Sequence, residues 1–179
     1  MTKRFYGLFT AFLMALLLLA AAAESAAQAK KAPAKGAEMA APQHTFTPDG
    51  IKWGPAPPFV EPGAQLAVVE GDPMAESGTY TIRLKMPAGY RIAPHWHPKR
   101  ENVTVISGSF KVGMGDKFDE SKMKSFPAGS FAYLDPDMHH YAMAGPGESI
   151  VQVHGLSPVK FNYVNPADDP SKKAPPAKR

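Results

Sequence analysis

Short segments in which apolar and polar residues alternate one by one constrain the fold of this chain more than any other feature. In TYTIRLKM, the side chains of Tyr80, Ile82, Leu84 and Met86 fall on one face and polar side chains fall on the other. Successive side chains of a β-strand point to opposite faces, so this alternation predicts a half-buried strand. Similar short runs are QLAVVEG, NVTVISG, FKVGM, SFAYL, YAMA and SIVQVHG, with turn signals such as EGDP, MPAG, FPAG, DPD and GPG between them. This series predicts an all-β domain, a small antiparallel sandwich or barrel.

Two further segments fit this fold without adding a central strand. WGPAPPFVEPG contains too many prolines for a central strand and is expected to run along the outside. DKFDESKMK is the one segment with helical character, and its charges favour a hairpin loop over a helical turn.

The first 29 residues have the composition of an export signal. Lys3 and Arg4 precede an apolar run from about Phe9 to Ala23, and the small residues of AQA follow. An uncleaved membrane anchor is the alternative, but the run falls short of the roughly 20 residues that span a bilayer. We therefore expect cleavage after Ala29 and a periplasmic or secreted protein with no stable membrane insertion.

Composition divides the remaining chain into three parts. Residues 30–43 are rich in Ala, Pro and Lys and predict a flexible linker; residues 166–179 have the same character and predict a disordered basic tail. The domain is expected over residues 44–165, with 11 basic and 12 acidic residues, and this near-neutral charge argues against nucleic-acid binding. The absence of cysteine excludes disulfides, thiolate zinc sites and cysteine nucleophiles.

Two histidines and a glutamate lie close together in GYRIAPHWHPKRENVTVISG. On a strand His95 and His97 share a face, with Cα atoms about 7 Å apart, so both imidazoles can bind one ion. Pro94 and Pro98 restrict the backbone on either side. Glu101 follows a predicted turn and can bring a carboxylate to the same point. Such ligands suit iron, manganese, nickel, copper or zinc, although an HxH pair alone is also compatible with ordinary surface or core histidines.

The spacing of Gly89, His95, His97, Glu101 and Gly108 resembles the first conserved motif of the cupin superfamily. All five fixed positions of that motif are present.

A later segment, FPAGSFAYLDPDMHHYAMAGPGE, resembles the second cupin motif, which supplies a further histidine after a turn and a strand. The resemblance assigns this role to His140 and turns His139 away. The sequence DPD replaces the Pro-Ala-Gly turn of many small cupins, so the choice between His140 and His139 remains open here.

The resemblance covers about residues 60–157 and implies a small single-domain bacterial cupin of the type-2 class. Its expected fold is a double-stranded β-helix, or jelly roll, in an antiparallel barrel. The implied metal ligands are His95, His97, Glu101 and His140, which would hold one divalent first-row transition metal with open positions for a small molecule. The resemblance also implies a homodimer formed through edge strands.

These features favour an exported metal-binding cupin, with dioxygenase-type chemistry on a small oxygen-bearing substrate as the catalytic hypothesis. The alternative is a non-catalytic ligand-binding or sensing module, because no general acid or nucleophile stands out beyond the ligand set. A copper-handling protein is a third hypothesis, based on export and on methionines such as Met138. His154 either lines the pocket from a neighbouring strand, as a base beyond the metal ligands, or faces solvent.

Overall fold

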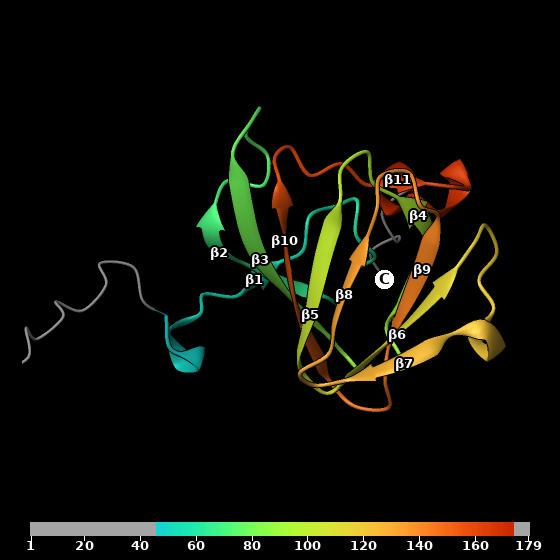
Figure 1. Ribbon diagram of the computed structural model, residues 1–179, viewed down its shortest axis with the longest axis horizontal. Helices are drawn as coiled ribbons and strands as arrows, with labels where there is room; N and C mark the ends of the chain where they lie inside the picture. Colours follow the sequence, from blue (N-terminus) through green and yellow to red (C-terminus); the bar gives the residue numbers. More distant parts are fainter. Residues whose placement is uncertain (1–45, 174–179) are drawn as a thin grey trace, which may run out of the picture. The chain divides into compact units, whose positions relative to one another are not determined.

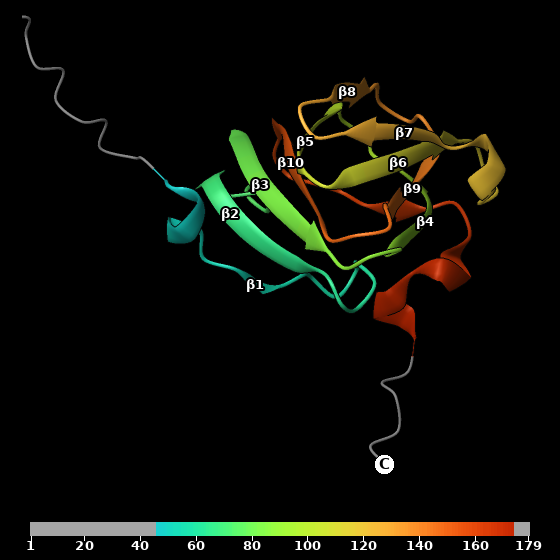
Figure 2. The ribbon, with the colours of Figure 1, turned by 90° about the horizontal axis from the view of Figure 1, so that it is seen from below.

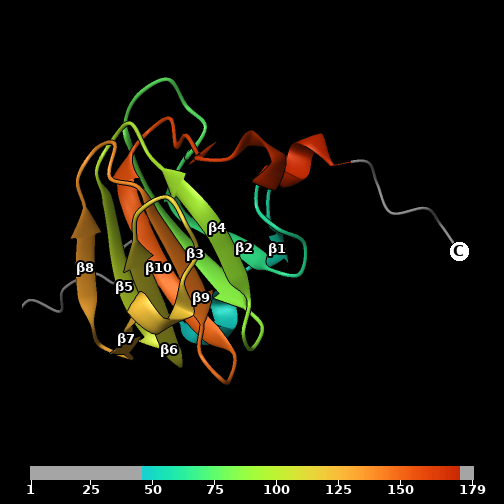
Figure 3. The same ribbon diagram turned by 90° about the vertical axis from the view of Figure 1, so that its right-hand side faces the viewer.

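The alternating segments form strands of two antiparallel β-sheets, seen from three sides in Figures 1, 2 and 3. The computed structural model describes residues 46–173, so the predicted signal peptide, the linker and residues 174–179 lie outside the described residues. The first sheet has six strands, in spatial order β1 (Gly54–Pro55), β2 (Gln65–Gly71), β3 (Thr79–Met86), β10 (Ser149–Leu156), β5 (Glu101–Ser107) and β8 (Phe131–Leu134). The second has five, in order β11 (Asn162–Tyr163), β4 (Arg91–Trp96), β9 (His140–Ala144), β6 (Ser109–Met114) and β7 (Lys124–Pro127).

The predicted all-β jelly roll is confirmed, in the form of two sheets that are not joined into one closed barrel. Within residues 46–173 the helical elements are 3-10 turns, at Pro48–Gly50, Glu120–Lys122, Pro166–Asp168 and Pro170–Lys172. No helix of this part of the chain is long and apolar enough to cross a membrane.

The core forms between the sheets because both sheets turn apolar residues toward their shared interior. Tyr80, Ile82 and Met86 of β3 are all buried, and Met86 has no exposed surface. They join one cluster with residues of the second sheet, including Phe110 of β6 and Ile92 of β4. Burying a large apolar side chain contributes about 1.5–3 kcal/mol, so this alternation stabilises the pairing of the sheets.

Gly108 carries the chain from β5 in one sheet to β6 in the other. Its φ is +71°, a left-handed conformation that glycine adopts without strain. A Cβ atom here would lie 2.3 Å from the carbonyl oxygen of Glu148, so no other residue fits. The last glycine of the first motif is therefore required by the backbone geometry.

Four segments refine the sequence-based expectations. The proline-rich segment near the start supplies only β1, a two-residue strand at the edge of its sheet. The charged loop joins the antiparallel strands β6 and β7 and contains the 3-10 turn Glu120–Lys122, so it is a hairpin loop with one helical turn. Strand β7 was not predicted, because its FP dipeptide also belongs to the turn signal FPAG. Residues 166–173, which the sequence assigns to the tail, form two 3-10 turns.

Strand β6 passes so close to β9 that one position accepts only glycine. A Cβ atom on Gly113 would lie 2.3 Å from the ring of Tyr141, which is fully buried. We predict that Gly113→Ala lowers the free energy of unfolding by about 1–3 kcal/mol, because neither the ring nor the strand can move without loss of packing. Urea denaturation measures the change.

Gly147→Ala is the matched control, because a Cβ atom there meets nothing within 4 Å. Its effect should stay within about 0.5 kcal/mol. Equal stability of the two variants would contradict the close packing of β6 on Tyr141.

Candidate metal centre

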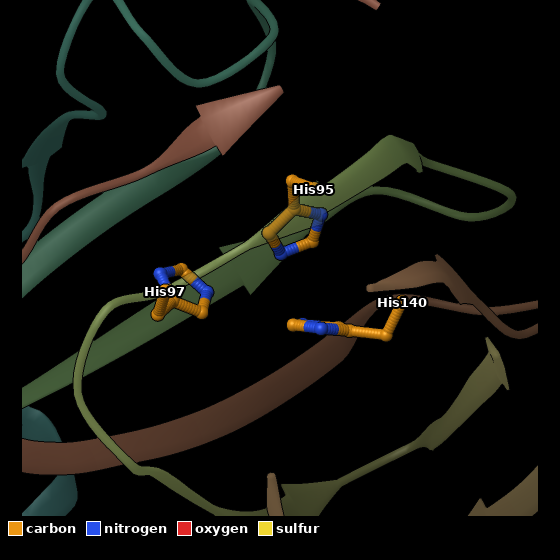
Figure 4. Close-up of side chains that lie close together, drawn as sticks. All are labelled: His95, His97 and His140. Carbon is orange, nitrogen blue, oxygen red and sulfur yellow. The ribbon is translucent and has the colours of Figure 1, made fainter. Parts of the chain in front are cut away.

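Three histidines from two neighbouring strands bring their imidazole rings together (Figure 4). His95 lies in β4 and is paired directly with His140 at the start of β9, and His97 follows the end of β4. All three residues are buried, with exposed fractions of 3% for His95, 7% for His97 and 3% for His140. One ring nitrogen from each lies within 4.8 Å of the others, so the rings can share one small cation.

Hydrogen bonds to backbone carbonyls orient the three rings in the same way. The Nδ1 atoms of His95 and His140 each donate to the carbonyl oxygen two residues earlier, over 2.8 and 2.9 Å. Nδ1 of His97 donates to the carbonyl oxygen of Lys160 over 2.6 Å. A carbonyl oxygen only accepts, so in each ring the proton is on Nδ1 and the Nε2 lone pair is free to bind a metal.

Glu101 brings a carboxylate to these rings from the opposite sheet, since it is the first residue of β5. Its Oε1 lies 3.6 Å from Nε2 of His97, and its Oε2 lies 3.5 Å from Nε2 of His140. In neutral histidines these Nε2 atoms are acceptors, as carboxylate oxygens are. A cation between them satisfies both kinds of group.

The Nε2 atom of His97 gives an independent reason to place a cation here. This atom is buried and has no hydrogen-bond partner within residues 46–173. A buried polar atom without a partner costs about 1–3 kcal/mol, and coordination of a metal ion removes that cost. The three imidazoles and one carboxylate therefore fit a divalent first-row transition metal.

The charges of the site also suit a cation. Burial lowers the pKa of His95 well below its ordinary value, with further lowering by His140 and His97, so this imidazole is neutral near pH 7. Burial raises the pKa of Glu101, but the adjacent His140 and His97 outweigh burial, and the net direction is down. A neutral imidazole and an ionised carboxylate are the forms that bind metal.

The segment after the last long strand encloses the cluster, and the sequence did not predict this. The ring of Phe161 stacks on His95 with centroids 3.9 Å apart, and it meets His97 edge-on at 5.1 Å. The short strand β11 pairs with β4 directly after Phe161. The signal that was missed is the alternation of Val159, Phe161 and Tyr163, which has the two-residue period of a strand.

The structure brings together the four residues that the cupin resemblance assigns as ligands, and it places His139 outside them. The imidazole of His139 is partly exposed and its Nδ1 lies 2.6 Å from a carboxylate oxygen of Asp116. His154 is also separate, since its ring stacks with that of the exposed Phe131, on the outer face of the first sheet.

The methionines considered for copper lie in two environments. Met86 and Met143 are buried in the core, whereas Met114 and Met138 are partly exposed at the wall of a cavity that also contains the four candidate ligands.

The sequence matches the family model described as the ChrR cupin-like domain over residues 41–160. No curated protein is significantly similar to it. Among solved structures, polyketide cyclase RemF from Streptomyces resistomycificus has a TM-score of 0.58 and 14% identity, covering 72% of this chain and 89% of that chain. A cupin 2 conserved barrel domain protein from Rhodopseudomonas palustris has a TM-score of 0.51 and 15% identity, covering 67% and 81%. An RmlC-like cupin from Ralstonia eutropha has a TM-score of 0.51 and 17% identity, covering 65% and 70%. At these identities the likeness shows the fold alone.

The stacking of Phe161 on His95 predicts that this ring supports metal binding. Phe161→Ala removes the face that holds His95 and the edge that meets His97. We expect zinc affinity to fall about tenfold or more, as is typical when a group that orients a ligand is removed. Competition with a chelating dye measures the affinity.

Tyr163→Phe is the control in the same segment. It removes the hydrogen bond from the Tyr163 hydroxyl to the carbonyl oxygen of Phe59 and leaves the aromatic ring. It should cost about 1 kcal/mol of stability without changing zinc affinity. If the two variants bind zinc equally well, Phe161 does not position the histidines.

Proposed function

The chain belongs to the family of ChrR cupin-like domains, and we propose that it is an exported protein that binds one divalent first-row transition metal. The proposed ligands are His95, His97, Glu101 and His140. The observation that carries this proposal is the shared orientation of the three imidazoles, each with its Nδ1 proton held by a backbone carbonyl. When bound, the ion would supply a Lewis acid with coordination positions open to an oxygen-bearing molecule.

The residues of this chain would each have a defined part in that function. The three histidines bind as neutral ligands from the second sheet, and Glu101 adds a negative charge from the first. The carbonyl of Lys160 and the ring of Phe161 keep His97 and His95 in place. The burial of the cluster keeps bulk water away from most of the site.

Metal analysis of the purified mature protein tests the ligand set. We expect about one equivalent of metal per chain, and a loss of nearly all of it in His97→Ala, because truncation removes one of four ligands. His139→Ala is the matched control and should keep its metal, since His139 pairs with Asp116 instead. Equal metal content in both variants would reject the proposed ligand set.

Two roles are compatible with such a centre, and we propose the catalytic one as a dioxygenase-type reaction on a small oxygen-bearing molecule. RemF, an enzyme with a similar fold, supports the suitability of this scaffold for catalysis. One observation favours the second role, a non-catalytic binding or sensing module. Beyond the four ligands, the titratable residues that line the cavity in the described chain are Lys122, Lys124 and Tyr133, and all three are exposed. Within the described residues, the cavity wall therefore offers no buried general acid or base besides the proposed ligands.

Oxygen consumption separates these roles. Iron-loaded protein is mixed with a panel of phenolic and dicarbonyl compounds, and dissolved oxygen is followed with an electrode. Dioxygenase activity predicts consumption that requires a particular compound and is absent in His97→Ala. Iron-loaded protein that consumes no oxygen with any compound would instead support the binding or sensing module.

Location and assembly complete the proposal. Residues 1–29 have the composition of an export signal, which supports a periplasmic or secreted protein. Strands β8 and β7 each lie at the end of their sheet, and an unpaired edge of this kind supports the proposed homodimer. Cell fractionation and light scattering of the mature protein test these two points.

A further inference from the structure

The proposed metal centre opens into a cavity of about 490 Å³ between the two sheets. This volume lies within the range of about 300–1,000 Å³ that is typical of small-molecule sites. Both sheets supply apolar walls, for example Leu84 and Val103 from the first and Val112 and Phe126 from the second. The cavity is therefore much larger than a metal ion and a few waters require.

The polar groups of this cavity are not spread evenly. Four of the polar residues that line it are the proposed metal ligands, and Lys122, Lys124 and Tyr133 are the other three. The rest of the wall is apolar. A sugar or other polyhydroxylated molecule would lose its hydrogen bonds to water against such a wall, at a cost of about 1–3 kcal/mol for each unpaired group. An apolar body gains free energy there instead.

The rim of the cavity is also apolar and adaptable. Met74, Met114 and Met138 each line the cavity and are 60%, 48% and 41% exposed. Methionine is unbranched and polarizable, so it packs against apolar molecules of varied shape. Three such residues, each exposed and part of the cavity wall, suit the entry of an apolar molecule.

One positive charge faces this opening without a partner. Lys124 lies on β7 opposite Val112. It lies on the same inner face of the strand as Phe126, two residues later. Lys122 is paired with Asp119 at 3.4 Å, whereas Lys124 makes no ion pair among residues 46–173. An uncompensated ammonium group beside an apolar wall attracts anions and disfavours cations.

From these observations we infer that the cavity binds an anionic molecule with an extended apolar body, such as a medium-chain alkyl carboxylic acid. The carboxylate lies at the histidine end and the body fills the space between the sheets. Lys124 favours the anion at the rim. The position of the carboxylate rests on the proposed metal centre, whereas the apolar character of the body rests on the cavity wall.

A chain-length series tests the inference. Zinc-loaded, delipidated mature protein is titrated calorimetrically with acetate, hexanoate, octanoate and decanoate. Each buried methylene contributes about 0.8 kcal/mol, so affinity should rise about fourfold per added methylene until the cavity is full. Decylamine has the same body with the opposite charge and should bind at least tenfold more weakly than decanoate. If acetate binds as tightly as decanoate, or decylamine does, the inference is overturned.

Variants on one strand locate the binding site. Ala132 of β8 lines the cavity, and the neighbouring Phe131 is exposed on the outer face. Ala132→Phe should remove most of the affinity gain between hexanoate and decanoate, and the smaller Ala132→Leu should remove part of it if the first variant does not fold. Phe131→Ala is the control and should leave the gain unchanged. An unchanged gain in a folded Ala132 variant would contradict binding in this cavity.

Metal content measured on the same preparations separates this inference from the proposed function. Protein that holds zinc but shows no gain with chain length overturns the inference and leaves the metal proposal standing. Protein that holds no zinc but still shows the gain supports the apolar site and overturns the metal proposal.

Discussion

Hydrogen bonds from three imidazole Nδ1 atoms to backbone carbonyls are the interaction on which the site depends. They fix the tautomer of His95, His97 and His140 before any ligand arrives. One carbonyl, that of Ala93, belongs to the same strand as its histidine, and a second, that of Met138, belongs to the turn directly before β9, so local backbone geometry sets these two ring orientations. The third belongs to Lys160, which is distant in sequence. This bond makes the site depend on residues 159–163, the segment that follows β10 and covers the histidines.

The two sheets have different parts in this arrangement. The second sheet places the histidines through the direct pairing of His95 with His140, and the first sheet contributes Glu101 at the start of β5. The carboxylate and the imidazoles meet only because the sheets pack face to face. The apolar residues that drive this packing also form the cavity wall, so the forces that stabilise the fold and the properties of the binding space come from the same side chains.

Much of the architecture follows from the sequence, because alternation with period two is a local property. The strands around Ile82, Val103 and Val151 were predicted in this way, as was the shared face of His95 and His97. The choice of His140 over His139 rested on a resemblance, because alternation alone does not tell which residue of an adjacent pair points inward. In the structure, Asp137 adopts a positive φ of 62° in the turn before β9, the strand begins at His140, and the ring of His140 is buried whereas that of His139 is partly exposed.

Other features of the fold and site could not be predicted from any local sequence pattern. The contact of Phe161 with His95 joins residues 66 positions apart, and the size of the cavity depends on how the sheets are spaced. Strand β7 was not predicted, because its last residue, Pro127, belongs to the turn signal FPAG. These features arise from long-range packing, which a single sequence does not encode in any one segment.

The segment of residues 159–163 also determines where a recombinant fragment of this domain can end. The family match ends at residue 160, one position before Phe161 and within the segment whose carbonyl holds His97. A fragment trimmed to that match would keep all four candidate ligands and lose the ring that packs on them. Recombinant versions and fusion junctions for this protein should therefore extend past β11, so that the covering strand accompanies the residues it supports.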